Sequence, residues 1–206
     1  KLEVYADRIL QFKEHSLYII NVSETVDFLE DTLRNKGCAF DYHVTKTDFG
    51  IAWFNIHGVY FYDGQKVTNL LERGGMMVVN ESDWETFIIN SGDTDMSEAH
   101  IGFIPKKRQL IINNQATHIF IYDFVLGSWM KGSTKLAVTT NRTNFALDSD
   151  QDLFYLTGTA STIRKWSPNA ATSSGFETIT KDIDFGEPGV RKKIYRVYVT
   201  YKTGGT

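Results

Sequence analysis

The stretch from Thr47 to Gly64 constrains the fold more than any other part of the chain, because it encodes a complete β-hairpin. Two runs rich in aromatic and β-branched residues flank a tight turn near Ile56, and such residues favour the pleated backbone. Gly58 and Gly64 supply the backbone freedom that chain reversals need. We therefore predict an antiparallel hairpin here. Hairpins occur in many protein classes, so this prediction concerns architecture and leaves function open.

Composition favours an all-β chain that is long enough to bury a sizeable core. The sequence has 206 residues, of which 14% are aromatic and only 3 are proline. This balance is typical of sheet and unlike that of disordered segments. Charge is nearly balanced, with 22 basic and 25 acidic residues, so no overall basic field favours nonspecific nucleic-acid binding. No run reaches the roughly 18 apolar residues of a membrane helix, and we expect no membrane segment.

The single cysteine and the first residues bear on the compartment. Cys38 cannot form an internal disulfide, which fits a reducing compartment or a protein assembled inside a cell. We expect it to pack as a small apolar residue. Residues 1–4 lack the pattern of a signal peptide, and the sequence does not begin with Met. We therefore expect a piece of a longer polypeptide.

Hairpin patterns recur along the chain. Strand pairs are predicted at 8–13 with 16–22, 101–104 with 109–112, and 144–147 with 153–156, and single strands at 43–48, 66–71, 118–122 and 162–166. Turns at Glu14, Ile56, Lys107 and Asp150 are separated by 42, 51 and 43 residues. A period of roughly 40 to 50 residues with several strands per unit is typical of β-propeller blades. A β-sandwich of unrelated hairpins is the alternative that the repeat leaves open.

Two aromatic pairs fit the propeller hypothesis. Tyr122 and Trp129, with six residues between them, are spaced as at the turn from the third to the fourth strand of a kelch-type blade, although the usual paired glycines before them are missing. If Thr47 to Gly64 is the inner half of a blade, Trp53 and Phe61 are expected to pack between blades.

Two segments have helical spacing. The first covers 23–36, between Ser23 as a cap and Gly37 as a stop, with three apolar residues in register: Val26, Leu29 and Leu33. The second covers 82–90, where Ser82 and Glu85 have the pattern of a capping box, and its apolar face consists of Trp84, Phe87 and Ile88. We predict a short helix in each segment, the second inserted where the repeat is longest.

The predicted organisation is a β-propeller-like region over 1–170, with about four blade units, followed by a further β module over 171–206. Around 169–175 the composition shifts to Ala, Ser, Thr and Gly, as expected of a connector. Strand patterns at 178–185 and 193–202 open the second module, which the sequence cuts short.

The sequence carries no motif for catalysis, metal binding or a cofactor, and we predict none of the three. Asp148 to Asp152 has the alternating carboxylates of a calcium loop, but Leu153 stands where that loop needs glycine and Thr159 where it needs a bidentate glutamate. We therefore predict a solvated hairpin turn. Residues 127–132 lack the lysine of a phosphate loop. The five histidines include no pair at the spacing of a zinc site.

Several segments resemble tail structural proteins of marine podovirus-type tailed bacteriophages. They are KTDFGIAW at 46–53, GVYFYDG at 58–64, IPKKRQL at 104–110, KDIDFG at 181–186 and KKIYRVYV at 192–199. The resemblance implies a nozzle-like or hub-like tail component whose propeller domains assemble as a homo-oligomeric ring, and it carries no catalytic residue. It further implies a non-enzymatic virion protein that is assembled in the host cytoplasm, contacts other tail proteins and allows transient passage of DNA.

Two other functions stay open at this stage. A carbohydrate-binding module that reads host-surface glycans could stack sugar rings on exposed aromatic residues such as Trp53, Trp129 or Trp166. Burial of these tryptophans in the core is the competing expectation. A glycoside hydrolase would need two carboxylates that face each other across a propeller funnel, and such a pair cannot be picked from the sequence.

Overall fold

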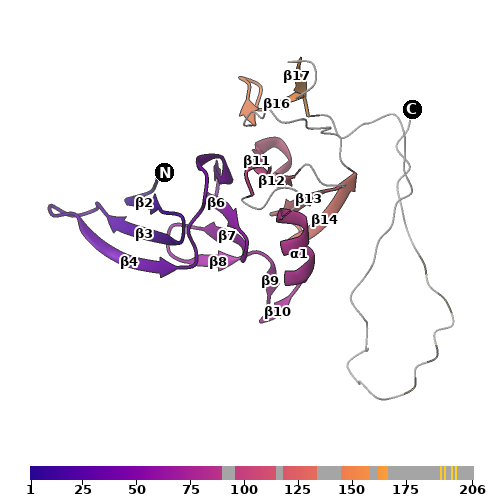
Figure 1. Ribbon diagram of the computed structural model, residues 1–206, viewed down its shortest axis with the longest axis horizontal. Helices are drawn as coiled ribbons and strands as arrows, with labels where there is room; N and C mark the ends of the chain where they lie inside the picture. Colours follow the sequence, from indigo (N-terminus) through magenta and orange to yellow (C-terminus); the bar gives the residue numbers. More distant parts are fainter. Residues whose placement is uncertain are drawn as a thin grey trace. The chain divides into compact units, whose positions relative to one another are not determined.

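A computed structural model describes residues 1–89, 96–114, 118–133, 145–157 and 162–166, together with Arg191, Lys193, Arg196 and Tyr198. The chain divides into two compact units, Lys1–Ser167 and Pro168–Thr206. The described part of the first unit consists of successive antiparallel β-sheets with one α-helix inserted (Figure 1). The predicted all-β fold with propeller-like blades is thus confirmed. The strands predicted at 178–185 and 193–202 lie outside the described residues, except for Lys193, Arg196 and Tyr198, which belong to no strand.

The first sheet has four strands in chain order, each antiparallel to the next. They are β1 (Leu2–Tyr5), β2 (Arg8–Phe12), β3 (Ser16–Asn21) and β4 (Phe28–Arg34). The hairpin predicted over 8–22 is confirmed as β2 and β3.

The helix predicted over 23–36 is wrong, because this segment supplies β4. Leu29 pairs with Ile20 and Leu33 with Leu17, and the register shifts between these pairs. In a regular strand, residues four apart lie on the same face of the sheet. The one-residue bulge between Leu29 and Leu33 places these two residues on opposite faces, so they form no shared apolar stripe. A short helix is stabilised mainly by packing of its apolar face, so its local preference alone is weak. As a strand, the same segment pairs its backbone N–H and C=O groups with those of β3.

The second sheet repeats the arrangement of the first. Its strands are β5 (Val44–Thr47), β6 (Gly50–Asn55), β7 (Gly58–Tyr62) and β8 (Val67–Asn69). The hairpin predicted over 47–64 is confirmed, and it forms the two central strands rather than an inner half. Every residue of β6 is buried, because this sheet is covered on both faces.

The third sheet has the same order and the fourth is described over three strands. They consist of β11 (His100–Ile104), β12 (Gln109–Asn113), β13 (His118–Asp123) and β14 (Ser128–Ser133), then β15 (Ala146–Leu147), β16 (Leu153–Thr157) and β17 (Thr162–Lys165). Tyr122 on β13 pairs with Trp129 on β14, as the kelch-like spacing predicted. A short 3-10 helix, η2 (Pro105–Lys107), joins β11 to β12.

An insertion separates the second sheet from the third, as the longest repeat predicted. It consists of the small hairpin β9 (Glu72–Arg73) and β10 (Met76–Met77), followed by α1 (Glu81–Ile88). The predicted helix is confirmed, but its N-cap is Asn80 and not Ser82, because the Asn80 side chain accepts a hydrogen bond from the Ser82 N–H at 3.0 Å. The predicted apolar face of α1 is buried.

The turns that suggested the repeat are of two kinds. Those at Glu14 and Ile56 join the second strand of a sheet to the third, whereas those at Lys107 and Asp150 join the first described strand to the second. The counterpart of the Glu14 turn in the third sheet is the connection between β12 and β13. The antiparallel sheet does repeat along the chain, but the four turns that suggested the period lie at opposite ends of the sheets.

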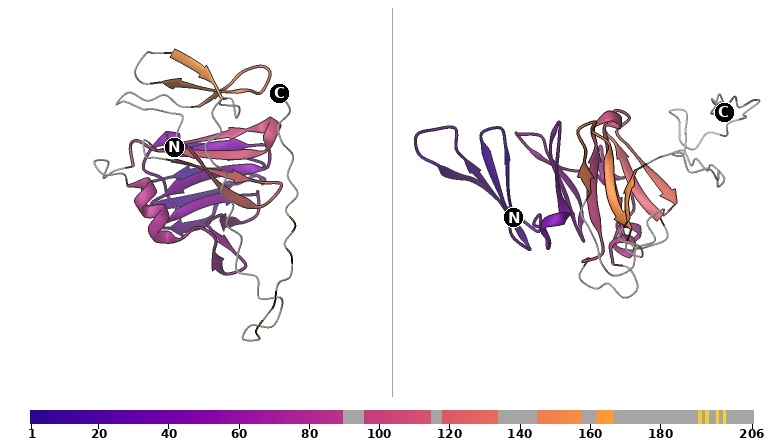
Figure 2. Two further views of the ribbon diagram at one scale, coloured as in Figure 1. Left: turned by 90° about the vertical axis from the view of Figure 1, so that its right-hand side faces the viewer. Right: turned by 90° about the horizontal axis from the view of Figure 1, so that it is seen from above.

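Figure 2 draws the strands of these sheets from two further sides. Apolar clusters connect consecutive sheets in chain order. Trp53 contacts Phe12 of the first sheet, with ring centroids 5.2 Å apart, whereas its neighbour Phe54 packs in the cluster shared with α1 and the third sheet. Phe61 contacts Phe124, which follows β13, at 5.0 Å. The predicted roles of Trp53 and Phe61 between blades are confirmed. Alternate residues of one strand thus serve two different interfaces.

Candidate functional site

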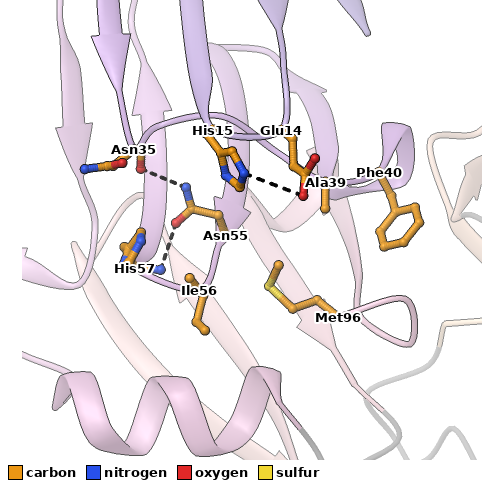
Figure 3. Close-up of a pocket in the computed structure, with 9 residues that line it drawn as sticks. All are labelled: Glu14, His15, Asn35, Ala39, Phe40, Asn55, Ile56, His57 and Met96. Carbon is orange, nitrogen blue, oxygen red and sulfur yellow. Dashed lines mark hydrogen bonds and ion pairs between the residues drawn. The ribbon is translucent and has the colours of Figure 1, made fainter. Parts of the chain in front are cut away.

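A pocket of about 470 Å³ opens where the second-to-third-strand turns of the first two sheets approach each other (Figure 3). Its lining comes from these two turns, from the connection between β4 and β5, and from Met96. The lining residues are Glu14, His15, Asn35, Ala39, Phe40, Asn55, Ile56, His57 and Met96.

Asn55, at the end of β6, holds two walls of this pocket together. Its side chain is buried, with 6% of the residue exposed. The Nδ2 group donates to the carbonyl oxygens of Asn35 and Gly37, both at 3.0 Å, and Oδ1 accepts from the His57 N–H at 2.8 Å. The Asn55 carbonyl accepts from Trp84 Nε1 at 2.9 Å, which ties the same residue to α1. Both Nδ2 and Oδ1 of Asn55 are therefore engaged in hydrogen bonds to the backbone of the pocket walls.

The connection after β4 is fixed against the turn between β2 and β3. The Asn35 N–H donates to the His15 carbonyl at 2.7 Å, and the Cys38 N–H to the Lys13 carbonyl at 3.0 Å. A Cβ at Gly37 would lie 2.1 Å from the Lys13 carbonyl oxygen, so this close approach requires glycine. The sequence suggested that Gly37 stops a helix, whereas the structure uses it for this contact.

A third wall is held by η1 (Asp41–His43). Tyr42 Oη donates to the Ser97 carbonyl at 3.0 Å, and His43 Nε2 lies 3.1 Å from the Met96 carbonyl oxygen. Because a carbonyl only accepts, the Nε2 atom of His43 carries the proton of that hydrogen bond. His43 is fully buried, and its ring centroid lies 4.3 Å from that of Phe54. It is therefore a core residue that holds the Met96 backbone in place.

The chemistry that the pocket presents is mixed. Its rim carries the exposed side chains of Glu14, His15 and His57, and the first two approach to 3.7 Å between His15 Nε2 and Glu14 Oε1. Half-buried Phe40, together with Ile56 and Met96, adds apolar surface. Imidazoles and a carboxylate beside an apolar wall can bind a polar group that carries an apolar body. The lining contains one carboxylate, whereas two-carboxylate glycoside hydrolysis needs a second.

The described residues include no group of three or more His, Cys, Asp or Glu side chains placed to hold a metal ion. Cys38 is buried, as predicted, and burial raises the pKa of its thiol to about 11. It is therefore protonated at neutral pH and a poor nucleophile. In the part of the chain that the structure describes, no helix has the length and apolar character to cross a membrane.

The aspartates of the proposed calcium-like loop form a hairpin turn, as predicted. Asp148 Oδ1 accepts from the N–H groups of Asp150 and Asp152 at 2.9 and 2.8 Å. The Asp152 carboxylate pairs with Lys165 and with Lys106, the latter at 3.0 Å. These two ammonium groups, Lys165 first, hold the pKa of Asp152 below its usual range. The carboxylates are thus used for the turn and for ion pairs.

The three tryptophans named as glycan contacts do not meet. Trp53 is fully buried and its Nε1 donates to the Lys36 carbonyl at 2.8 Å, so this residue cannot stack on a sugar and that expectation is wrong. Trp129 is half-buried, and its Nε1 donates to the Leu70 carbonyl at 2.8 Å. Trp166 is half-buried in the cluster between the third and fourth sheets. Each belongs to a different cluster, and none lines the pocket.

A second candidate surface is the face of the first sheet that turns away from the second sheet, here called the open face. Strand register and side-chain alternation define its members. They are Leu2, Val4, Ile9, Gln11, Tyr18, Ile20, Leu29 and Thr32. Val4, Ile9, Ile20 and Leu29 are direct neighbours across the four strands. Leu2, Val4 and Leu29 are 62%, 53% and 56% exposed. None of these eight residues is charged. Ser16 and Arg34 continue the same face at one end, where the Arg34 side chain adds a positive charge.

Neither surface could be predicted from the sequence. The open face follows from the same alternation that predicted the strands, but only once β4 is known to be a strand. The pocket corresponds to no sequence motif, because Asn55 has the pattern of an ordinary asparagine before a turn.

Comparison with known proteins gives a limited result. No protein-family model matches the chain, and neither does any curated protein. Among solved structures the chain is similar to the crystal structure of the computationally designed Ika4 protein, with 9% identity and a TM-score of 0.45 over 80% of this chain and 88% of that one. It is also similar to the N-terminal domain of Nup159, with 9% identity and a TM-score of 0.39 over 81% of this chain and 43% of that one. Similarity at this level carries no conclusion about function.

Proposed function

We propose that this chain is a non-enzymatic structural component of a virion, in the tail tube, nozzle, hub or adaptor of a tailed bacteriophage. It assembles in the host cytoplasm, with copies of itself and with other tail proteins. The observation that supports this proposal most directly is the open face of the first sheet. A contiguous row of eight uncharged residues across four strands is unfavourable in water and is typical of a surface that another protein covers.

The way the sheets are joined supports a rigid module. Each junction between consecutive sheets buries large apolar side chains, such as Trp53, Phe54 and Phe120, and close packing of this kind transmits strain with little deformation. The resemblance of 46–53 and 104–110 to phage tail proteins supplies the setting. A formal net charge of −3 suits a conduit for DNA, because a conduit should not bind phosphates tightly.

Catalysis and glycan binding have less support. The pocket combines one carboxylate with two imidazoles, and its buried amide, Asn55, is committed to the walls. Trp53 is buried, and Trp129 and Trp166 lie in separate clusters. We therefore propose no second function.

Two measurements test the proposal. Light scattering coupled to size-exclusion chromatography should show an oligomer of the full-length protein, and peptides of the chain should be found by mass spectrometry in purified particles of the phage that encodes it. A protein that stays monomeric at every concentration tested and is absent from particles would overturn the proposal.

A further inference from the structure

We propose that the open face of the first sheet is covered by the outer face of the fourth sheet of a second copy of this chain, so that the succession of sheets continues from one copy into the next. The inference rests on the proposed function, because it names the contact through which copies assemble.

The repeated junction between consecutive sheets supports this choice of partner. In the second sheet, alternate residues such as Trp53 and Tyr62 face the preceding sheet, whereas Phe54 and Ala52 face the following one. The third sheet divides its residues in the same way, with Phe103 facing backward and Ile104 forward. Each described junction thus joins the forward face of one sheet to the backward face of the next.

Only one of the two faces of the first sheet packs against another described sheet. Its forward face, with Leu10, Phe12, Leu17 and Ile19, is buried against the second sheet. Its backward face is the open face, where Val4 and Leu29 are more than half exposed. By continuity with the other junctions, the matching surface is the forward face of a further sheet.

The fourth sheet carries such a face. Leu153 and Trp166 pack in the cluster shared with the third sheet, so the alternate residues of β16 and β17 are directed away from it. Phe154 lies on this outer face, beside Ala146 on β15, and Ile163 on β17 is 66% exposed. The Lys165 ammonium on the same face is paired with Asp152, which reduces its charge at the surface.

Pairing of two open faces with each other would be the symmetric alternative. It would join two backward faces, an arrangement that does not occur between any of the sheets that the structure describes. A contact between different faces of two copies is head-to-tail, and such contacts generate closed rings or open filaments. Either form is an assembly of copies of this chain, as the proposed function expects.

Cysteine cross-linking tests which faces meet. Val4→Cys and Ile163→Cys are introduced in separate full-length chains that carry different affinity tags, and the chains are mixed under mild oxidation. The inference expects disulfide-linked dimers that contain both tags and no Val4→Cys dimer with itself. Val125→Cys is the matched control, because Val125 is also 66% exposed but lies in the turn between β13 and β14. Cys38 is buried and should not cross-link in the wild type.

Charge insertion gives a second readout. Val4→Lys and Ile163→Lys should each weaken self-association by at least about tenfold, because burying an unpaired ammonium is unfavourable, whereas Val125→Lys should leave it unchanged. Both target residues are exposed, so circular dichroism should show an unchanged fold. Val4→Cys dimers with themselves, or an oligomer that resists both lysine variants, would reject this contact while leaving the proposed function in place. A wild type that stays monomeric at every concentration tested would reject this contact, and it would overturn the proposed function as well if the chain were also absent from purified particles.

Discussion

Replacing Asn55 by Asp should destabilise the protein strongly, although the two side chains have nearly the same shape. The substitution keeps an oxygen for the His57 N–H but removes the Nδ2 donor from the carbonyls of Asn35 and Gly37. An unpaired buried carbonyl costs about 1–3 kcal/mol, and the Asn35 carbonyl is only partly buried. The sum is a loss of about 2–5 kcal/mol in the free energy of unfolding, a large part of the 5–15 kcal/mol of a typical domain.

The penalty should depend on pH in a defined direction. The introduced carboxyl is buried against two carbonyl oxygens, so its pKa is higher in the folded state than in the unfolded one. Its destabilising effect is therefore greater at pH 7 than in acid, and it decreases as the pH falls through the raised pKa toward that of an unfolded aspartate, about 4. Urea unfolding followed by tryptophan fluorescence at pH 7 and at pH 4.5 measures both values.

Asn69→Asp is the matched control. Asn69 Oδ1 also accepts a backbone N–H two residues later, from Leu71 at 3.1 Å, but its Nδ2 donates to the exposed Glu72 carboxylate. Loss of that exposed contact should change stability by no more than about 1 kcal/mol. Equal penalties for the two variants, or a pH-independent penalty for Asn55→Asp, would refute the role assigned to Asn55.

Three further outcomes are expected. Gly37→Ala should lower the melting temperature by several degrees because its Cβ would meet the Lys13 carbonyl, and an unchanged melting temperature would contradict that close approach. The pKa of Asp123 is lowered by the Gln109 side chain and by the Leu126 N–H, so its stabilisation is present above the pKa of an unfolded aspartate and lost as the pH falls through its folded pKa. Asp123→Asn should therefore flatten the loss of stability below about pH 4 in acid titrations, and an unchanged slope would count against these bonds. Cys38 should react with a disulfide reagent at pH 8 only after unfolding in guanidinium, whereas rapid reaction in the native protein would show that the thiol is accessible.

The sequence by itself determined the features that depend on near neighbours along the chain. The hairpin of Thr47 to Gly64, the pairing of Tyr122 with Trp129 and the helix at α1 could be predicted, because side-chain periodicity and turn residues act over a few positions. The interblade role of Trp53 followed from the interpretation of this hairpin as part of a propeller blade.

Only the tertiary structure decided the features that join distant residues. The segment 28–34 became β4 because β3 offered it an edge, which no local spacing could indicate. Trp53 is unavailable for stacking because its ring is fully buried between the first two sheets. Asn55 holds the walls of the pocket together because its side chain reaches the Gly37 carbonyl, 18 residues away. The open face likewise depends on which side of the first sheet the second one covers. A pattern of alternating residues specifies that a strand has two faces, and only packing determines which of them is left for a partner.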